Sequence, residues 1–165
     1  IGLQEFDAPF RLTEKNLFGL LGETYAEAVC AGTEPDRNWN PILYRPDRFD
    51  LIACGNQAFS RGTEWSLPAS YPSDSKTTHH RTLTWAVFRL KETGRVVILL
   101  NAHYHVDSRM TAAESEEILA DEAREVTEKA NELALAYPGA VLFAVGDYRY
   151  SGGGNSGPWE KAPRL

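Results

Sequence analysis

The residues best suited to take part in a reaction follow an apolar run in the stretch ILLNAHYHVD, residues 98–107. Asn101, His103 and His105 stand two positions apart, and Asp107 follows two places later. Side chains alternate along a strand, so the amide and both imidazoles are expected on one face. Imidazoles can donate to a phosphoryl oxygen or transfer a proton near neutral pH. The pattern therefore indicates one wall of a phosphate-processing site.

Two further apolar runs end in carboxylates. The run AVLFAVGD ends at Asp147, and the opening IGLQE ends at Glu5. Strands of an α/β sheet commonly build a site from polar groups beyond their C-terminal ends. Carboxylates at such a place suit a hard cation such as Mg²⁺, which takes oxygen ligands and keeps waters for a substrate. The strand ends thus predict a divalent-metal site beside the histidines.

Taken singly, each of these residues has an ordinary structural explanation. A Gln-Glu pair after a strand is usually the first solvated turn, and Gly-Asp is a common turn opener. A lone histidine at a strand end is more often hydrogen-bonded structure than a catalyst, and Arg81 ahead of a strand is ordinarily surface charge. Only the order of these residues along the chain favours a functional site.

The elements that must position these groups can be predicted from periodicity and turn signals. Residues 13–30 suit a helix, although Gly19 and Gly22 weaken its regularity. Residues 41–45 and 48–54 flank a Pro-Asp turn and are expected to be strands. Residues 55–80 are rich in Gly, Ser, Pro and Thr and are expected to be mostly loop.

The second half of the chain has a stronger pattern. Strands are expected at 82–90 and 95–106, and a fully buried strand at 140–147. Thr111 and Glu114 form a capping-box pattern that begins a helix, and Tyr137 ends it before a proline. The combination predicts an α/β (α+β) sandwich. Its strands 84–90, 96–102 and 140–146 should share one sheet or two packed sheets, with helix 112–137 outside.

The whole series resembles the endonuclease/exonuclease/phosphatase superfamily, which includes deoxyribonucleases, apurinic-site endonucleases, sphingomyelinases and inositol-polyphosphate phosphatases. The matching segments are IGLQE, NPILYRPDRFDLI, HHRTLTWAVFRLKETGRVVILLNAHYHV and AVLFAVGDY. Arg-x-x-Thr-Trp at 81–85 together with Asn-x-His at 101–103 is the most specific part of this combination. The resemblance implies a four-layered, deoxyribonuclease-like α/β sandwich of two packed mixed sheets with outer helices.

The resemblance also implies roles for individual residues. Glu5 matches the metal-binding glutamate, His103 the histidine that contacts the scissile phosphate, and Asp147 the aspartate that orients or activates the attacking water. The implied reaction is hydrolysis of a phosphoester by in-line attack of water, with Mg²⁺ (or Mn²⁺) as cofactor. Contacts with the substrate are expected from a second set of residues: Asn101, Arg81, Arg149 and His105.

The chain departs from the family pattern at four places. Arg149 stands where the Gly-Asp-x-Asn motif has asparagine, and Asn38 stands where many relatives have a second glutamate. The family's first strand would precede Ile1, and its closing Asp-His pair would follow Leu165. The chain is therefore expected to be the middle of one domain, residues 1–165, that is incomplete at both ends.

These departures leave two functions open. The first is a divalent-metal phosphoesterase, and the second is a catalytically silent member of the same superfamily that serves as a binding module. Arg149 could contact phosphate, or it could pair with Asp147 or Glu5 and silence the site. A third interpretation is an unrelated α/β domain in which the motifs are coincidental.

Composition and net charge limit the classes of partner that can be expected for this chain. The 165 residues carry a formal net charge of -6, which argues against broad binding to a nucleic-acid backbone. No apolar run is long enough for a membrane span, and no targeting segment is visible, so the sequence names no compartment and no oligomeric state. Cys30 and Cys54 lack CxxC spacing; they could pair in an oxidising compartment, but two such cysteines are more often small buried hydrophobes.

Overall fold

The computed structural model of the chain describes residues 1–4, 21, 24–29, 40–61, 63–65, 77–79, 81–104 and 111–148. Its centre is a four-stranded mixed sheet with the strand order β3-β6-β7-β8. The strands are β3 (Phe49–Ala58), β6 (Thr82–Leu90), β7 (Val96–His103) and β8 (Val141–Asp147). β6 pairs antiparallel with both β3 and β7, and β8 joins β7 in parallel. The three strands predicted to share a sheet do so.

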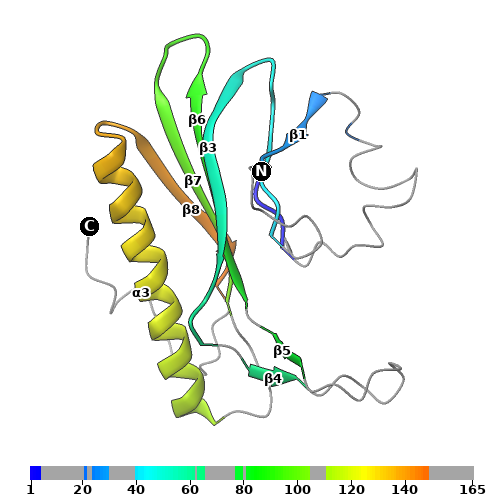
Figure 1. The fold of residues 1–165 in the computed structure, drawn as a ribbon, viewed down its shortest axis with the longest axis vertical. Helices are drawn as coiled ribbons and strands as arrows, with labels where there is room; N and C mark the ends of the chain where they lie inside the picture. Colours follow the sequence, from blue (N-terminus) through cyan, green and yellow to red (C-terminus); the bar gives the residue numbers. More distant parts are fainter. Residues whose placement is uncertain are drawn as a thin grey trace.

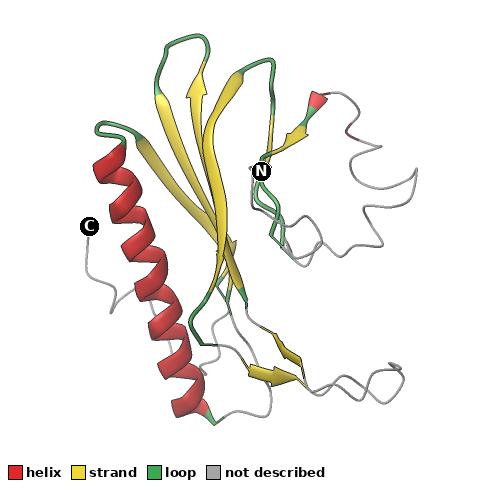
Figure 2. Ribbon diagram, in the orientation of Figure 1, coloured by secondary structure: helices red, strands yellow, loops and turns green. Residues whose placement is uncertain are grey.

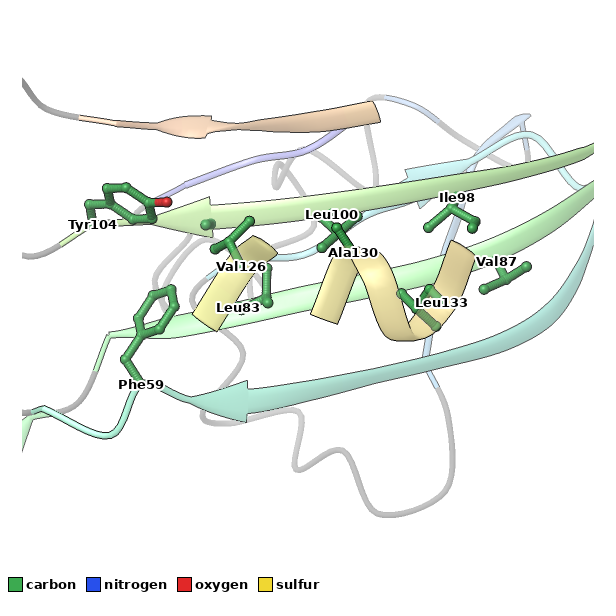
Figure 3. Close-up of a cluster of buried hydrophobic side chains, with 10 residues drawn as sticks. Phe59, Leu83, Val87, Ile98, Leu100, Tyr104, Val126, Ala130 and Leu133 are labelled. Carbon is green, nitrogen blue, oxygen red and sulfur yellow. The ribbon is translucent and has the colours of Figure 1, made fainter. Parts of the chain in front are cut away.

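The helix α3 (Ala112–Ala136) covers one face of this sheet (Figure 1). Its predicted capping box is confirmed, because the Thr111 side chain accepts from the backbone N–H of Glu114 and the Glu114 carboxylate accepts from the backbone N–H of Thr111. Alternate residues of β6 and β7 pack against α3 and form the main core (Figure 3): Leu83, Val87, Ile98 and Leu100 with Val126, Ala130 and Leu133. The helix therefore lies outside the sheet, as predicted.

A smaller layer of chain covers the opposite face of the sheet (Figure 2). It contains the antiparallel pair β1 (Ala26–Glu27) and β2 (Leu43–Tyr44), and Gly2 forms a bridge with Ile42 beside them. A second core cluster lies between this layer and the main sheet: Ala28, Ile42, Ala86 and Phe88. Helix, large sheet and small sheet are successive layers of a sandwich, which confirms the predicted α/β class.

The helix predicted over 13–30 is wrong at its C-terminal end. Ala26 and Glu27 form β1, and the backbone N–H of Ala28 donates to the carbonyl oxygen of Ile42 at 2.8 Å. Pairing with β2 buries Ala28, and this tertiary contact outweighs the helical periodicity of the segment. Residues 13–20 lie outside the described part of the chain.

The loop predicted over 55–80 is wrong in three places. β3 continues to Ala58, and β4 (Thr63–Trp65) pairs antiparallel with β5 (Thr77–His79). The continuation of β3 was not predicted because Gly55 follows the predicted strand, and glycine usually weakens a strand. In the structure it is paired with Trp85, and a Cβ at Gly55 would lie 2.7 Å from the indole Cζ2. The glycine therefore makes room for the indole within the sheet.

The strand predicted to be fully buried, β8, is partly exposed. Val141 is 45% exposed and Phe143 is 51% exposed. β8 pairs only with β7 in the described sheet, so it is an edge strand there. Val141 and Phe143 are paired with Val97 and Leu99 and so point away from α3, to the face that the small layer covers only in part.

Cys54 is disulfide-bonded, so the expectation that both cysteines are simple buried hydrophobes is wrong for this residue. Cys30 is the only other cysteine of the sequence and lies outside the described residues. A disulfide depends on the proximity of distant segments rather than on a spacing motif, which is why the sequence did not settle it.

Candidate active site

The C-terminal ends of β7 and β8 bring two of the predicted site residues together. His103 is the last residue of β7, Asp147 is the last residue of β8, and the two are partners in the parallel register. Residues paired in this way point to the same face of a sheet. Ile98 and Leu100 of β7 pack toward α3, so Asn101 and His103 lie on the opposite face. The register therefore places His103 beside Asp147, while their predicted convergence with Glu5 in one cleft stays a prediction.

Asn101 is fully buried and ties two distant segments to β7. Its Nδ2 atom donates to the carbonyl oxygens of Leu3, Asn40 and Pro41 at 2.9, 3.1 and 3.2 Å. Its Oδ1 atom accepts from the Gln4 side-chain amide at 2.5 Å. Asn101 therefore holds the opening segment and the start of the small layer against the sheet. Its predicted contact with substrate stays a prediction.

Arg81 contacts the imidazole of His103. The Arg81 Nη1 atom lies 3.0 Å from His103 Nδ1, and His103 is 1% exposed. Arg81 stands immediately before β6, and its carbonyl oxygen accepts a hydrogen bond from the backbone N–H of Phe59 at 2.9 Å. Arg81 therefore lies beside His103, and its predicted role as a substrate contact stays a prediction.

Asn40 is a site residue that the sequence did not indicate. Its Nδ2 atom donates to the carbonyl oxygen and to the hydroxyl of Thr82 at 2.7 and 3.1 Å, while its own carbonyl oxygen accepts from Asn101. Its Oδ1 atom is buried and has no hydrogen-bond partner among the described residues. Gln4, the neighbour of Glu5, was likewise noted in the sequence but given no role. Only the pairing of distant segments reveals either residue.

The donor set can be tested against a divalent cation. Asp147 and the unpaired Oδ1 atom of Asn40 are hard oxygen donors of the kind that Mg²⁺ or Mn²⁺ takes. By donor type these oxygens suit such an ion. Within the described residues, however, no group of three or more His, Cys, Asp or Glu side chains could hold one. Glu5, the predicted ligand, lies outside the described residues, as do His105 and Arg149.

Two tyrosines lie on the α3 side of the same strand ends. Tyr104 follows β7, Tyr148 follows β8, and their rings meet edge to face with centroids 4.9 Å apart. Burial raises the pKa of Tyr104 well above its usual value and raises the pKa of Tyr148 to about 12. Both phenols are therefore neutral at ordinary pH. They pack the strand ends against the core.

Gly146 gives β8 its close approach to β7 beside the site. A Cβ at Gly146 would lie 2.0 Å from the carbonyl oxygen of Ala102, its partner in the register. Any side chain would push the two strands apart just before His103 and Asp147. The glycine of the Gly-Asp pair is therefore required for the packing of β8 against β7.

We expect Gly146→Ala to lower the free energy of unfolding by about 3 kcal/mol, the upper end of the cost of overpacking. Gly94→Ala is the matched control, because a Cβ at Gly94 meets no atom within 4 Å and carries only the strain of a φ of 70°. That strain costs roughly 1 kcal/mol. Urea unfolding of both variants would measure the difference, and equal costs would contradict the proposed clash.

No model of a known protein family matches the sequence, and no curated protein matches it either. Several solved structures are similar to this chain. The human Nocturnin catalytic domain with bound sulfate anion is 15% identical, with 89% of this chain and 50% of that one covered and a TM-score of 0.59. Truncated TDP2 from Caenorhabditis elegans is 20% identical, with 99% and 52% covered and a TM-score of 0.59.

An endonuclease/exonuclease/phosphatase family protein from Bacteroides thetaiotaomicron is 22% identical, with 76% of this chain and 42% of that one covered and a TM-score of 0.50. The chain has the fold of endonuclease/exonuclease/phosphatase proteins, which confirms the sequence resemblance at the level of the fold. It spans about half the length of these structures.

Proposed function

We propose that the protein is a phosphoesterase that hydrolyses a phosphodiester or phosphomonoester with the help of Mg²⁺ or Mn²⁺. The observation that carries this proposal is the placement of His103 and Asp147 as partners at the ends of two adjacent parallel strands. Such strand ends are where α/β sheets commonly bind ligands. The sulfate bound to the similar Nocturnin domain is a tetrahedral anion like phosphate, which supports the same substrate chemistry.

The roles of the residues follow from their chemistry. Asp147 accepts a hydrogen bond from a water and takes its proton as the water attacks phosphorus in line with the leaving oxygen. His103 donates a hydrogen bond to a phosphoryl oxygen on which negative charge gathers. The bond between phosphorus and the leaving oxygen breaks, and that oxygen takes up a proton from solvent water. A bound cation, with Glu5 as its expected ligand, would supply further charge stabilisation.

The substrates proposed for this site are small phosphate esters. The formal net charge of -6 does not favour long nucleic acids, although a nucleic-acid substrate remains compatible with a bridging cation. Within the described part of the chain, no helix combines the length and the apolarity that a bilayer span requires.

Metal removal tests the proposal directly. We expect the full-length protein to hydrolyse bis(p-nitrophenyl) phosphate or p-nitrophenyl phosphate in Mg²⁺ or Mn²⁺, and to lose this activity in excess EDTA and regain it when the ion is restored. Released nitrophenolate measures the rate. Full turnover in EDTA would remove the cation from the proposed mechanism.

The alternative function is a silent phosphate-binding module, which the replacement of the motif asparagine by Arg149 favours. A guanidinium is charged and offers a planar fork of donors to phosphate oxygens. Binding of inorganic phosphate by calorimetry, without turnover of either ester, would support this alternative. A large gain of activity in Arg149→Asn would show that the arginine blocks the site.

A further inference from the structure

The guanidinium of Arg81 lies against one ring nitrogen of His103. A guanidinium has only donors, so the contact of 3.0 Å between Arg81 Nη1 and His103 Nδ1 makes Nδ1 the acceptor. An acceptor nitrogen carries no proton. The neutral imidazole that makes this contact therefore has its proton on Nε2.

The backbone holds Arg81 where this contact can form. Its carbonyl oxygen accepts from the backbone N–H of Phe59, which is itself buried in the main core. The next residue, Thr82, begins β6 and accepts two hydrogen bonds from the buried Asn40. The backbone of Arg81 and the residue that follows it are thus both anchored, which limits where the guanidinium can reach.

We propose that Arg81 is a positioning residue that holds His103 in its Nε2–H tautomer, and that it does not itself bind the substrate. This proposal rests on the proposed function for what the Nε2–H group then does, which is to donate to a phosphoryl oxygen. It differs from the substrate contact that the sequence predicted for Arg81. The contact is a hydrogen bond within the protein, made by a buried imidazole at the end of β7.

The tautomer has a chemical consequence. A neutral Nε2–H imidazole can stabilise a phosphoryl oxygen by donating a hydrogen bond throughout the reaction. If the proton moved to Nδ1, Nε2 would be an acceptor facing an anion, and the stabilisation would be lost. Arg81 therefore acts on the reaction through the imidazole, and its loss should change kcat rather than substrate affinity.

Nitrogen-15 NMR of the full-length protein tests the tautomer without reference to activity. The chain has four histidines, and the signals of His103 would be assigned by their absence from His103→Gln. We expect a protonated Nε2 and an unprotonated Nδ1 in the wild type and in Arg81→Lys, which keeps a cationic donor. We expect Arg81→Met to show a substantial population protonated at Nδ1. A wild-type ring protonated at Nδ1, or an unchanged tautomer in Arg81→Met, would overturn the proposal.

Kinetics separate positioning from substrate binding. Arg81→Met should lower kcat by about 10- to 100-fold, the effect typical of losing a group that orients an imidazole. KM should stay within about twofold, and Arg81→Lys should recover much of the rate. Arg89→Met, on the exposed part of β6, is the matched control and should change neither constant. A raised KM with an intact kcat would make Arg81 a substrate contact and overturn the proposal.

The two proposals fail in different ways. If the wild type hydrolyses no ester, the proposed function fails, while the NMR spectrum still decides whether Arg81 sets the tautomer. If Arg81→Met does not fold, Arg81→Gln replaces it in both measurements, and a wild-type ring protonated at Nδ1 would still overturn the proposal.

Discussion

His103→Ala should lower kcat for phosphoester hydrolysis by about 10² to 10⁴-fold, the range typical of losing a positioned proton or hydrogen-bond donor. The imidazole is 1% exposed at the end of β7 and lies beside Asp147 in the register. Initial rates in Mg²⁺ at saturating ester would measure the loss.

Matched variants make this result interpretable. His103→Asn keeps a side-chain N–H donor but cannot transfer a proton, so a rate between wild type and alanine would assign His103 to hydrogen-bond donation. Asp147→Asn should also abolish most activity, whereas Asp50→Asn, an exposed carboxylate on β3, should not. Wild-type rates in His103→Ala would exclude this site as the place of reaction.

The elements around the site could be predicted where the local pattern and the tertiary structure agree. β6 begins and ends where expected, and α3 begins at its predicted capping box. The segment at 26–27 could not be predicted, because its strand exists only through pairing with β2. The exposure of Phe143 was also hidden, because an apolar run does not tell an edge strand from a central one.

The sequence could suggest individual residues of the candidate site, but it could not give the register and contacts that arrange them. Alternation placed Asn101 and His103 on one face, and the family resemblance selected Asp147 from a distant strand. The register that pairs Asp147 with His103 is set by packing across the whole sheet, so it could not be deduced from either strand. The contact of Arg81 with His103 joins residues 22 positions apart and has no signature in the sequence.

Asn101→Asp should be the most destabilising single-atom change near the site, with a loss of about 3 to 5 kcal/mol in the free energy of unfolding. The substitution replaces Nδ2 by an oxygen that would face the carbonyl oxygens of Leu3, Asn40 and Pro41. A buried carboxylate without a donor carries its full desolvation cost, and protonation could satisfy only one of the three carbonyls. Urea unfolding followed by circular dichroism would measure the change.

Asn131→Asp is the control, because Asn131 is exposed on α3 and the same atom change there should stay within about 0.5 kcal/mol. The structural effect of Asn101→Asp should be confined to the segments that Asn101 ties to β7. The backbone N–H of Leu3 donates to the carbonyl oxygen of Pro41 at 3.0 Å, and the backbone N–H of Leu43 donates to the carbonyl oxygen of Ile1 at 2.8 Å. Both amides should exchange with deuterium faster in Asn101→Asp, because the amide that ties their segments to β7 is gone. Unchanged exchange at Leu3 and Leu43, with unchanged unfolding, would show that Asn101 does not hold the opening segment.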